Sequence, residues 1–518
     1  MTQFLASIGF DRWILHVLLV LPLLGVIPVL FGPVALARRT ALVVTIVEFV
    51  LSAGLWWAVN TTPGTLQLTS SFPWIPAWGI SYAVGIDGIS LTMVLLTTLL
   101  MPLCVLGSWN YITQRERGYY AMLLTLLTGV LGVFLATDLF LFYVFWEVML
   151  IPMYFIIGMW GGKNRLYAAI KFFVFTMAGS LLMLVAILVL AWSVAGRTGT
   201  LSFAYEHLLA NSQAVGPLAP WLFGAFALAF AIKVPVFPFH TWLPDAHVEA
   251  PTAGSVLLAG VLLKLGTYGF LRFAVPFFPA VATSPWVTNL ILVLAIVGIV
   301  YGALVAMVQP DIKKLVAYSS VSHLGFVMLG IWAATVQSIE GAIMVMIGHG
   351  LSTGALFFLV GMLYERRHTR DISAYGGIAR VVPVFSLVFT VVALSSIGLP
   401  GLNGFIGEFL VLLGSFRGHP VATGIATTGV IFAAAYLLWA LQRIIYNKLD
   451  KQENESLADL SPRELMVMVP LLLGILWMGL YPAPILRRLE PAAVRYIEAT
   501  RGPTRLEDVS QQAPAVRR

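Results

Sequence analysis

Cysteine and charge are both scarce in this chain. Cys104 is the only cysteine, and it lies within a hydrophobic run. A single cysteine cannot form a disulfide, an iron–sulfur cluster or a cysteine-rich zinc site within one chain. Charged residues make up 10% of the sequence, whereas soluble domains contain about 25%. These shortages exclude a soluble globular protein and a chain that carries electrons through metal centres of its own.

Nucleotide-binding motifs are missing as well. The sequence has no Gly-x-Gly-x-x-Gly after a predicted strand and no Walker lysine loop. The net charge is +7, but the basic residues lie in short segments between hydrophobic runs, which does not give the basic face of a nucleic-acid-binding protein. We therefore expect no cofactor in this chain and no nucleic acid partner. Energy for any transport must come from an ion gradient or from other subunits.

Long hydrophobic runs dominate what is present. Hydrophobic residues make up 59% of the 518 residues, and the mean hydropathy is +0.92. The first run has no small-residue cleavage site, so it is interpreted as a membrane span and not as a signal peptide. Because most runs have the length that crosses a bilayer, we predict an all-α polytopic membrane protein with about fourteen transmembrane helices. The predicted spans are 14–31, 41–58, 86–108, 119–136, 139–158, 167–192, 221–244, 254–276, 286–308, 313–332, 340–363, 383–411, 422–446 and 464–482.

Basic residues gather in every second loop between these spans. The basic residues assigned to the alternate loops, on the opposite side of the membrane, are only Arg197, Arg272 and Arg417. By the positive-inside rule the basic loops face the cytoplasm, which predicts that both termini lie on the non-cytoplasmic side. The basic residues of the tail, such as Arg487 and Arg488, run against this rule.

An internal repeat divides the chain. The segment beginning Thr137-Asp-Leu-Phe resembles the one beginning Pro310-Asp-Ile-Lys, and each is followed by a helix that proline or glycine interrupts. Each copy contains about five spans, an odd number, so the second copy is predicted to enter the membrane inverted, as in many transporters. The predicted regions are a three-span region at 1–118, a first inverted repeat at 119–276, a second at 286–446, and a last span with its tail at 447–518.

Each predicted break lies beside an ionisable residue. Lys233 lies two residues before Pro235 and five before Pro238, and Glu408 follows the Gly398–Gly404 segment. A lysine at the centre of a bilayer costs roughly 2.5–3.5 kcal/mol on insertion scales. The prolines also remove backbone donors that lipid cannot replace. An ionisable group beside a broken helix at membrane depth is typical of a site that handles ions.

Six ionisable residues inside predicted spans are the candidate functional residues. Histidine titrates near neutrality, and a lysine outside water can release its proton near neutrality. The alternative for the lysines and glutamates is a structural ion pair between helices. The alternative for the histidines is a hydrogen bond to the backbone of a neighbouring helix. The six are Glu147, Lys233, Lys264, His323, His349 and Glu408.

A carboxylate near Lys233 can switch that lysine between holding and releasing a proton. At a separation of about 7 Å and an effective dielectric near 20, Glu147 would favour the charged lysine by about 2.4 kcal/mol. Forming and breaking such a pair is therefore large enough to move a proton.

Other polar residues have simpler explanations. Structural roles are favoured for Glu48 and Lys171, and helix caps for Asp87 and Asp138. The 238–251 stretch places acidic residues and histidines at the cytoplasmic mouth, where a hydrated proton uptake path or a structural loop is favoured over a metal site. These mouth residues are His240, Asp245, His247 and Glu249.

Four long motifs stand out, beginning at Phe145 (FWEVMLIPM), Lys233 (KVPVFPFHTWLPDAH), Pro251 (PTAGSVLLAGVLLKLGTYG) and Lys313 (KKLVAYSSVSHLG). These motifs resemble the antiporter-like subunits of respiratory complex I, which are related to Mrp-type cation/proton antiporters and membrane-bound hydrogenase subunits. The resemblance covers nearly the whole chain. Two features favour one branch of this family. Glu408 at the second break is acidic, whereas the other subunits usually have a lysine at that position. The tail after the last span is also too short to contain the long lateral helix of one sister subunit.

The resemblance implies a role for each candidate residue. Glu147 would modulate Lys233, the central proton carrier of the cytoplasmic half. Lys264 and His323 would connect along a hydrated axis, with His349 near the turn toward the second half. Glu408 would be the terminal site, passing protons to the neighbouring subunit or to the outer side.

The resemblance also implies a setting and partners. The chain would be a proton-translocating subunit of NADH:quinone oxidoreductase in a bacterial inner membrane, beside other antiporter-like subunits. FMN, iron–sulfur clusters and quinone would lie in partner subunits. A cation/proton antiporter or hydrogenase subunit is the alternative within this class, and a purely structural membrane scaffold is the alternative outside it.

Overall fold

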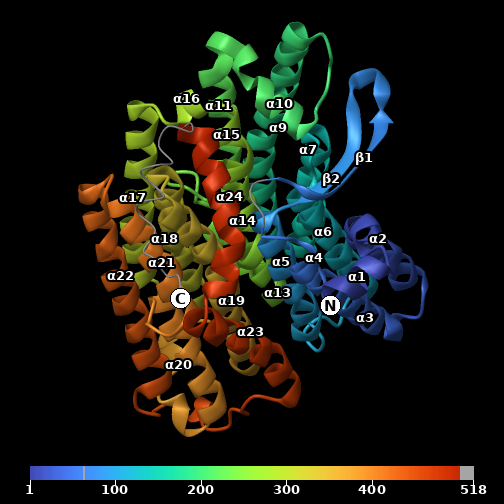
Figure 1. The fold of residues 1–518 in the computed structure, drawn as a ribbon. Helices are drawn as coiled ribbons and strands as arrows, with labels where there is room; N and C mark the ends of the chain where they lie inside the picture. The colour runs from blue at the N-terminus through green and yellow to red at the C-terminus, as the bar shows by residue number, and fades with distance from the viewer. Residues whose placement is uncertain (62–64, 502–518) are drawn as a thin grey trace.

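The computed structural model describes residues 1–61 and 65–501, and these are mainly helical (Figure 1). Within them, thirteen helical segments are long and apolar enough to cross a membrane. This finding confirms the predicted polytopic membrane fold. The segments are α2 (Phe10–Phe31), α3–α4 (Val34–Ala58), α5 (Gly88–Gly107), α6 (Glu116–Leu135), α7–α8 (Leu139–Trp160), α9 (Arg165–Thr198), α10–α11 (Tyr205–Lys233), α13–α15 (Thr252–Phe277), α17 (Pro285–Met307), α18 (Ile312–Ala333), α19 (Val336–Arg367), α22 with η7 (Pro420–Tyr446) and α23 (Pro462–Leu480).

The remaining predicted span, 383–411, consists of two short apolar helices. α20 (Pro383–Ile397) and α21 (Asn403–Phe416) are separated by a short non-helical segment that contains Gly398 and Gly401, both with positive φ. The first predicted break is also present, because α11 (Ala219–Lys233) ends at Lys233 and α12 begins only at Trp242. The inverted relation of the two repeats and the boundaries of the four regions stay predictions.

The three spans that carry Lys264, His323 and His349 form the centre of the molecule. In the most apolar part of the α13–α15 span and of α19, every residue is buried, and in that of α18 94% of the residues are buried. In the peripheral α3–α4 span, only 28% of the corresponding residues are buried. Helices α18 and α19 pack against each other, and α21 packs against α19. Polar residues at the centre are therefore screened from lipid by other helices.

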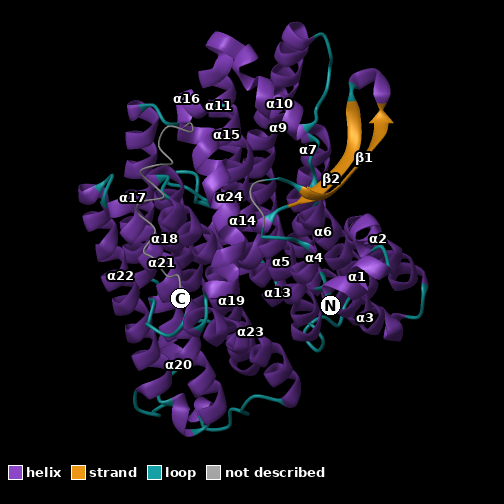
Figure 2. Cartoon of the chain, in the orientation of Figure 1, coloured by secondary structure: helices purple, strands orange, loops and turns teal. Residues whose placement is uncertain are grey.

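A two-stranded antiparallel hairpin projects from the helices (Figure 2). β1 (Gln67–Ile75) pairs with β2 (Ile80–Ile86), with Phe72 opposite Tyr82. This hairpin departs from the predicted all-α fold, and Pro73 within β1 interrupts the polar–apolar alternation that would indicate a strand. The pairing across the turn supplies the order that the local pattern does not show.

The last described helix, α24 (Ala483–Arg501), runs across the ends of several spans (Figure 1). It packs against α5, α15 (Val275–Phe277), α16 (Pro279–Ala282) and α19. One face of α24 is buried and apolar, including Ile485 and Leu489. Helix α24 therefore lies with its apolar face against the spans and its polar face outward.

Candidate functional site

Lys264 lies in one of the two most deeply buried spans among the described residues. It belongs to α14 (Leu263–Gly269), which is flanked by two π-helical segments, η3 (Leu258–Leu262) and η4 (Phe270–Ala274). Its Nζ atom lies 2.6 Å from Nδ1 of His349 and also donates to the carbonyl of Ala259 in η3. A π segment shifts the backbone pairing of a helix and frequently marks a functional site. The lysine is fully buried.

Two histidines connect Lys264 to Glu408. The ring centroids of His349 and His323 are 5.7 Å apart, and Nδ1 of His323 lies 2.8 Å from Oε1 of Glu408. Both histidines and Glu408 are buried. The structure thus brings four of the six candidate residues together, in the spatial order Lys264, His349, His323 and Glu408. In the resemblance Lys264 led to His323, whereas here His349 lies between them.

The second break positions Glu408. Gly398, with φ of +85°, lies so close that an added Cβ would be 3.3 Å from Oε2 of Glu408. Nδ2 of Asn403 donates to the Gly348 carbonyl at 2.9 Å and so ties α21 to α19. A cavity of about 10 Å³ between these groups is lined by His323, His349 and Glu408, which is about the smallest volume that holds one water molecule.

Lys233 and Glu147 form a separate pair near the first break. Lys233 is almost fully buried, and its Nζ has no hydrogen-bond partner in the described part of the chain. That Nζ lies 5.5 Å from the ring centroid of Trp146 and 5.3 Å from that of Phe172. The Glu147 carboxylate is close enough for its charge to act on Lys233, and its buried Oε1 has no hydrogen-bond partner in the described part of the chain. This lysine is held by aromatic rings and a nearby carboxylate and not by a direct ion pair.

The helices of the two central lysines are in contact. An added Cβ on Gly266 would lie 2.7 Å from the carbonyl oxygen of Phe230, so α11 and α14 pack backbone against backbone. The ammonium groups themselves point to different partners, Lys233 to aromatic rings and Lys264 to His349. A proton moving between the two lysines therefore needs an intermediate carrier.

His247 was predicted to lie at the cytoplasmic mouth of the bundle, but the structure buries it. His247 is fully buried, and neither ring nitrogen has a hydrogen-bond partner within residues 1–61 and 65–501. Its ring stacks on Phe357, with centroids 4.6 Å apart. Lys313 lies nearby, donating to the carbonyl of Ala250 at 2.6 Å. The only sequence feature that pointed to His247 was a second histidine seven residues before it, at position 240.

The other mouth residues do not cluster. Asp245 forms an ion pair with Lys171 at 2.7 Å, which agrees with the structural role favoured for that lysine. Glu249 accepts a hydrogen bond from the backbone of Asn164 at 2.9 Å. No group of three metal-ligating side chains was found among the described residues.

Arg272 was counted with the loop residues although the predicted span 254–276 contains it, and the structure places it inside the helical segment. Arg272 belongs to η4, inside the Thr252–Phe277 segment, and forms an ion pair with Asp87. Asp87 does cap α5, accepting a hydrogen bond from the backbone of Ser90. A lone arginine close to the end of a hydrophobic run gives no local signal of such a partner.

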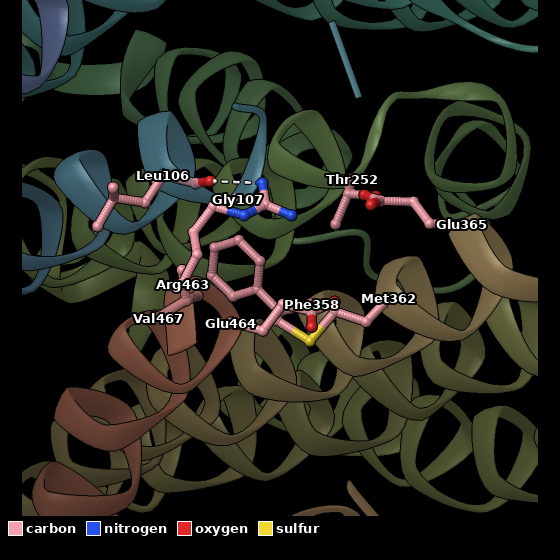
Figure 3. A pocket seen from close by; sticks show the side chains of 9 residues that line it. All are labelled: Leu106, Gly107, Thr252, Phe358, Met362, Glu365, Arg463, Glu464 and Val467. Carbon is pink, nitrogen blue, oxygen red and sulfur yellow. Dashed lines mark hydrogen bonds between the residues drawn. The ribbon is translucent and has the colours of Figure 1, made fainter. Parts of the chain in front are cut away.

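A separate small cavity is lined by charged residues of a different kind (Figure 3). Arg463 there donates to the Leu106 carbonyl at 3.2 Å. Glu464, which also lines this cavity, forms two hydrogen bonds of 2.7 and 2.8 Å with Arg366. These contacts join α5, α19 and α23, so the cavity is structural and separate from the Lys–His–Glu series.

Two family descriptions match the sequence. Residues 136–434 match "NADH:quinone oxidoreductase/Mrp antiporter, TM", and residues 19–135 match "NADH-ubiquinone oxidoreductase chain 4, amino terminus". The chain is 44% identical over 469 residues to NADH-quinone oxidoreductase subunit M of Rhodobacter capsulatus, covering 89% of this chain and 90% of the relative. It is 45% identical over 471 residues to subunit M of Escherichia coli K12, covering 88% and 91%.

Solved structures agree with the sequence matches. The fold matches a chain of respiratory complex I from Thermus thermophilus with a TM-score of 0.85 and 34% identity, covering 94% of this chain and 99% of that one. It matches a chain of the Mrp complex from Dietzia with a TM-score of 0.79 and 24% identity, covering 94% and 52%. The second match shows a shared fold only.

This chain belongs to the chain 4 or subunit M family of NADH:quinone oxidoreductase, the antiporter-like membrane subunits of respiratory complex I. The branch favoured by Glu408 and the short tail is thereby confirmed, and the antiporter or hydrogenase alternative is not favoured.

Proposed function

We propose that this chain carries protons across the membrane through the series Lys264, His349, His323 and Glu408. The observation that carries this proposal is the continuity of the series, with contacts of 2.6 and 2.8 Å at its two ends. A structural ion pair would need only two partners, whereas this series links four titratable groups across α14, α19, α18 and α21. Buried ionisable residues in a membrane protein are functional by default.

The energy for transport comes, in this proposal, from redox chemistry in other subunits. We propose that NADH oxidation, FMN, the iron–sulfur clusters and quinone belong to those subunits, and that this chain acts as the translocase part of the enzyme. The alternating basic loops support a bacterial inner membrane orientation with both termini outside the cytoplasm.

Proton uptake is assigned to the end of the bundle near Lys313. A cavity of about 40 Å³ there is lined by Glu249, Lys313 and Arg370, which gives room for more than one water molecule. His247 lies behind Lys313, and the charge of Lys264 acts on it. A neutral imidazole in this position can accept a proton on one nitrogen and release it from the other.

Glu147 and Lys233 are proposed to act as the switch. The carboxylate stabilises the charged lysine only while the two lie close together. Because no hydrogen bond fixes the ammonium in the described part of the chain, a small movement of either side chain changes which group holds the proton. His247, between the two lysine-bearing segments in sequence, is the proposed intermediate carrier toward Lys264.

Lys264 and His349 can hold only one excess proton between them. Two positive charges 2.6 Å apart would repel by about 6 kcal/mol at an effective dielectric of 20. An arriving proton therefore drives another from His349 toward His323, where Glu408 stabilises it. Glu408 then passes the proton to the neighbouring subunit or to the outer side.

The proposal is tested by replacing the switch residues. Lys233→Ala and Glu147→Ala should each abolish proton pumping while the assembled complex remains detectable on a native gel. Pumping is measured in inverted membrane vesicles by the quenching of a pH-sensitive dye on addition of NADH. Normal pumping in both variants would refute these roles.

A further inference from the structure

A buried ion pair lies at the far end of the span that carries Lys264. The guanidinium of Arg272 donates to the carboxylate of Asp87. Arg272 is 7% exposed and Asp87 is 8% exposed. The second carboxylate oxygen of Asp87 accepts from the backbone of Ser90 at 3.0 Å, so the pair fixes the start of α5 against η4. None of the proposed transport steps uses either residue.

Polar side chains continue from this pair back toward Lys264. Lys264, Tyr268 and Arg272 recur at the spacing that places side chains along one face of a helix. The hydroxyl of Tyr268 accepts from Nε of Arg272 at 3.3 Å and donates to the Phe134 carbonyl at 3.1 Å. It also lies 3.2 Å from Oγ of Ser90. The hydroxyls of Tyr268 and Ser90 therefore join the Arg272–Asp87 pair, one turn of helix beyond Lys264.

Helix α24 covers the pair from the other side. An added Cβ on Gly88 would lie 2.1 Å from the carbonyl oxygen of Arg488, so the backbone of α24 packs directly on the start of α5. Arg495 of α24 forms an ion pair with Glu206 at 2.6 Å, and its charge also acts on Asp87. The pair therefore lies between the buried Lys264 and the surface on which α24 rests.

We propose that Arg272 is a proton seal that closes the far end of the Lys264 span. A guanidinium stays charged at all physiological pH values, and a fixed buried arginine excludes protons and cations from a pore. Asp87 keeps this cation in place, and the ion pair with Arg272 in turn prevents the Asp87 carboxylate from accepting a proton. Protons that reach Lys264 then have only the lateral route through His349. This inference rests on the proposed function, because it assumes that Lys264 carries protons.

A purely structural ion pair makes a different prediction. Removing either partner of a buried pair leaves the other charge uncompensated and is strongly destabilising, so a structural pair predicts similar damage from both changes. A seal predicts asymmetry. Arg272→Gln removes the repelling cation and leaves a carboxylate that can accept protons. Asp87→Asn removes the carboxylate and keeps the cation.

The test measures passive proton leak with the whole purified complex in liposomes. A potassium gradient with valinomycin sets the membrane potential, no NADH is added, and a trapped pH dye reports proton influx. We expect Arg272→Gln to raise the leak about tenfold and Asp87→Asn to stay within about twofold of the unaltered complex. Adding Lys264→Met to Arg272→Gln should bring the leak back to the unaltered level, because the leak then lacks its carrier.

Three results would overturn the seal. They are an assembled Arg272→Gln complex that does not leak, equal leaks in the two single variants, and a leak that survives Lys264→Met. If Arg272→Gln does not assemble, the double variant Arg272→Met with Asp87→Asn removes both charges together and should leak in its place. Because the leak is measured without turnover, normal pumping by Lys233→Ala and Glu147→Ala would refute the proposed switch roles and leave this result unchanged.

Discussion

The two helix breaks place similar residues in different surroundings. At the first break, Nζ of Lys233 lies 5.5 and 5.3 Å from two aromatic ring centroids. It has no hydrogen-bond partner in the described residues. At the second break, Glu408 lies 2.8 Å from His323, within a series that continues to Lys264. The first region is loosely held and the second is directly bonded.

This difference suggests a division of labour. A cation over an aromatic ring gains about 0.5–2 kcal/mol, which a moderate change in the nearby carboxylate can outweigh. A charge-assisted hydrogen bond between buried groups is stronger and more fixed in direction. The loose pair therefore suits a switch, and the bonded series suits a path along which protons move when the switch has acted.

Breaking the bonded series should have the largest effect. Lys264→Met keeps the volume of the side chain but removes the proton carrier next to His349, and we expect pumping to fall by about a hundredfold or more. The measurement is dye quenching in inverted vesicles, normalised to the amount of assembled complex. Lys314→Met, a lysine at the start of α18 outside the series, is the matched control and should pump normally. A Lys264→Met complex with full pumping would remove Lys264 from the path.

Changing Glu408, at the end of the series, should have a smaller effect, and the effect should depend on the length and chemistry of the new side chain. Glu408→Gln keeps a hydrogen-bonding group beside His323 but cannot take a proton, so pumping should fall by about tenfold or more. Glu408→Asp keeps the carboxyl group at a greater distance from His323 and should retain more activity than Glu408→Gln. The account fails at this position if the glutamine variant pumps as well as the aspartate variant.

Altering the loose region gently should have a graded effect. Ser180 lies near the Glu147 carboxylate, although its hydroxyl donates to the carbonyl of Met177 at 3.1 Å. Removing a nearby hydroxyl changes the stability of the carboxylate by about 1 kcal/mol, roughly fivefold. We therefore expect Ser180→Ala to reduce pumping severalfold without abolishing it. Ser180→Thr keeps the hydroxyl and should be close to the unaltered complex. Complete loss in Ser180→Ala would contradict the view of this region as an adjustable switch.

A charged pair outside both regions should affect stability alone. Arg366 binds Glu464 through two hydrogen bonds of 2.7 and 2.8 Å. Arg366→Gln should lower the stability of the complex by about 1–3 kcal/mol, measured as a lower midpoint of thermal unfolding. Pumping per assembled complex should not change. A selective loss of pumping would show that charged pairs outside the series also take part in transport.

Most of the fold could be predicted from the sequence because it depends on local properties. Hydropathy and length located the thirteen candidate spans, and the glycine segment at 398–404 located the interrupted one. The β1–β2 hairpin was missed because its order comes from pairing across a turn, while Pro73 disguises the local pattern.

The candidate residues could be chosen from the sequence, but their partners could not. An ionisable residue within a hydrophobic run is a local signal, and it identified Lys264, His349 and Glu408. The contact of Lys264 with His349 and the pairing of Arg272 with Asp87 join helices distant in sequence. Such contacts follow from helix packing, including the π segments beside Lys264, and no local pattern reveals them.

The most direct test of the proton path is infrared difference spectroscopy of the reconstituted complex during turnover. We predict that the carboxylic acid stretch of Glu408 changes on addition of NADH and quinone, that Glu408→Gln lacks this band, and that His349→Phe abolishes the change while leaving Glu408 in place. A Glu408 signal that persists at full size in assembled His349→Phe complex would contradict the path from Lys264 through the two histidines.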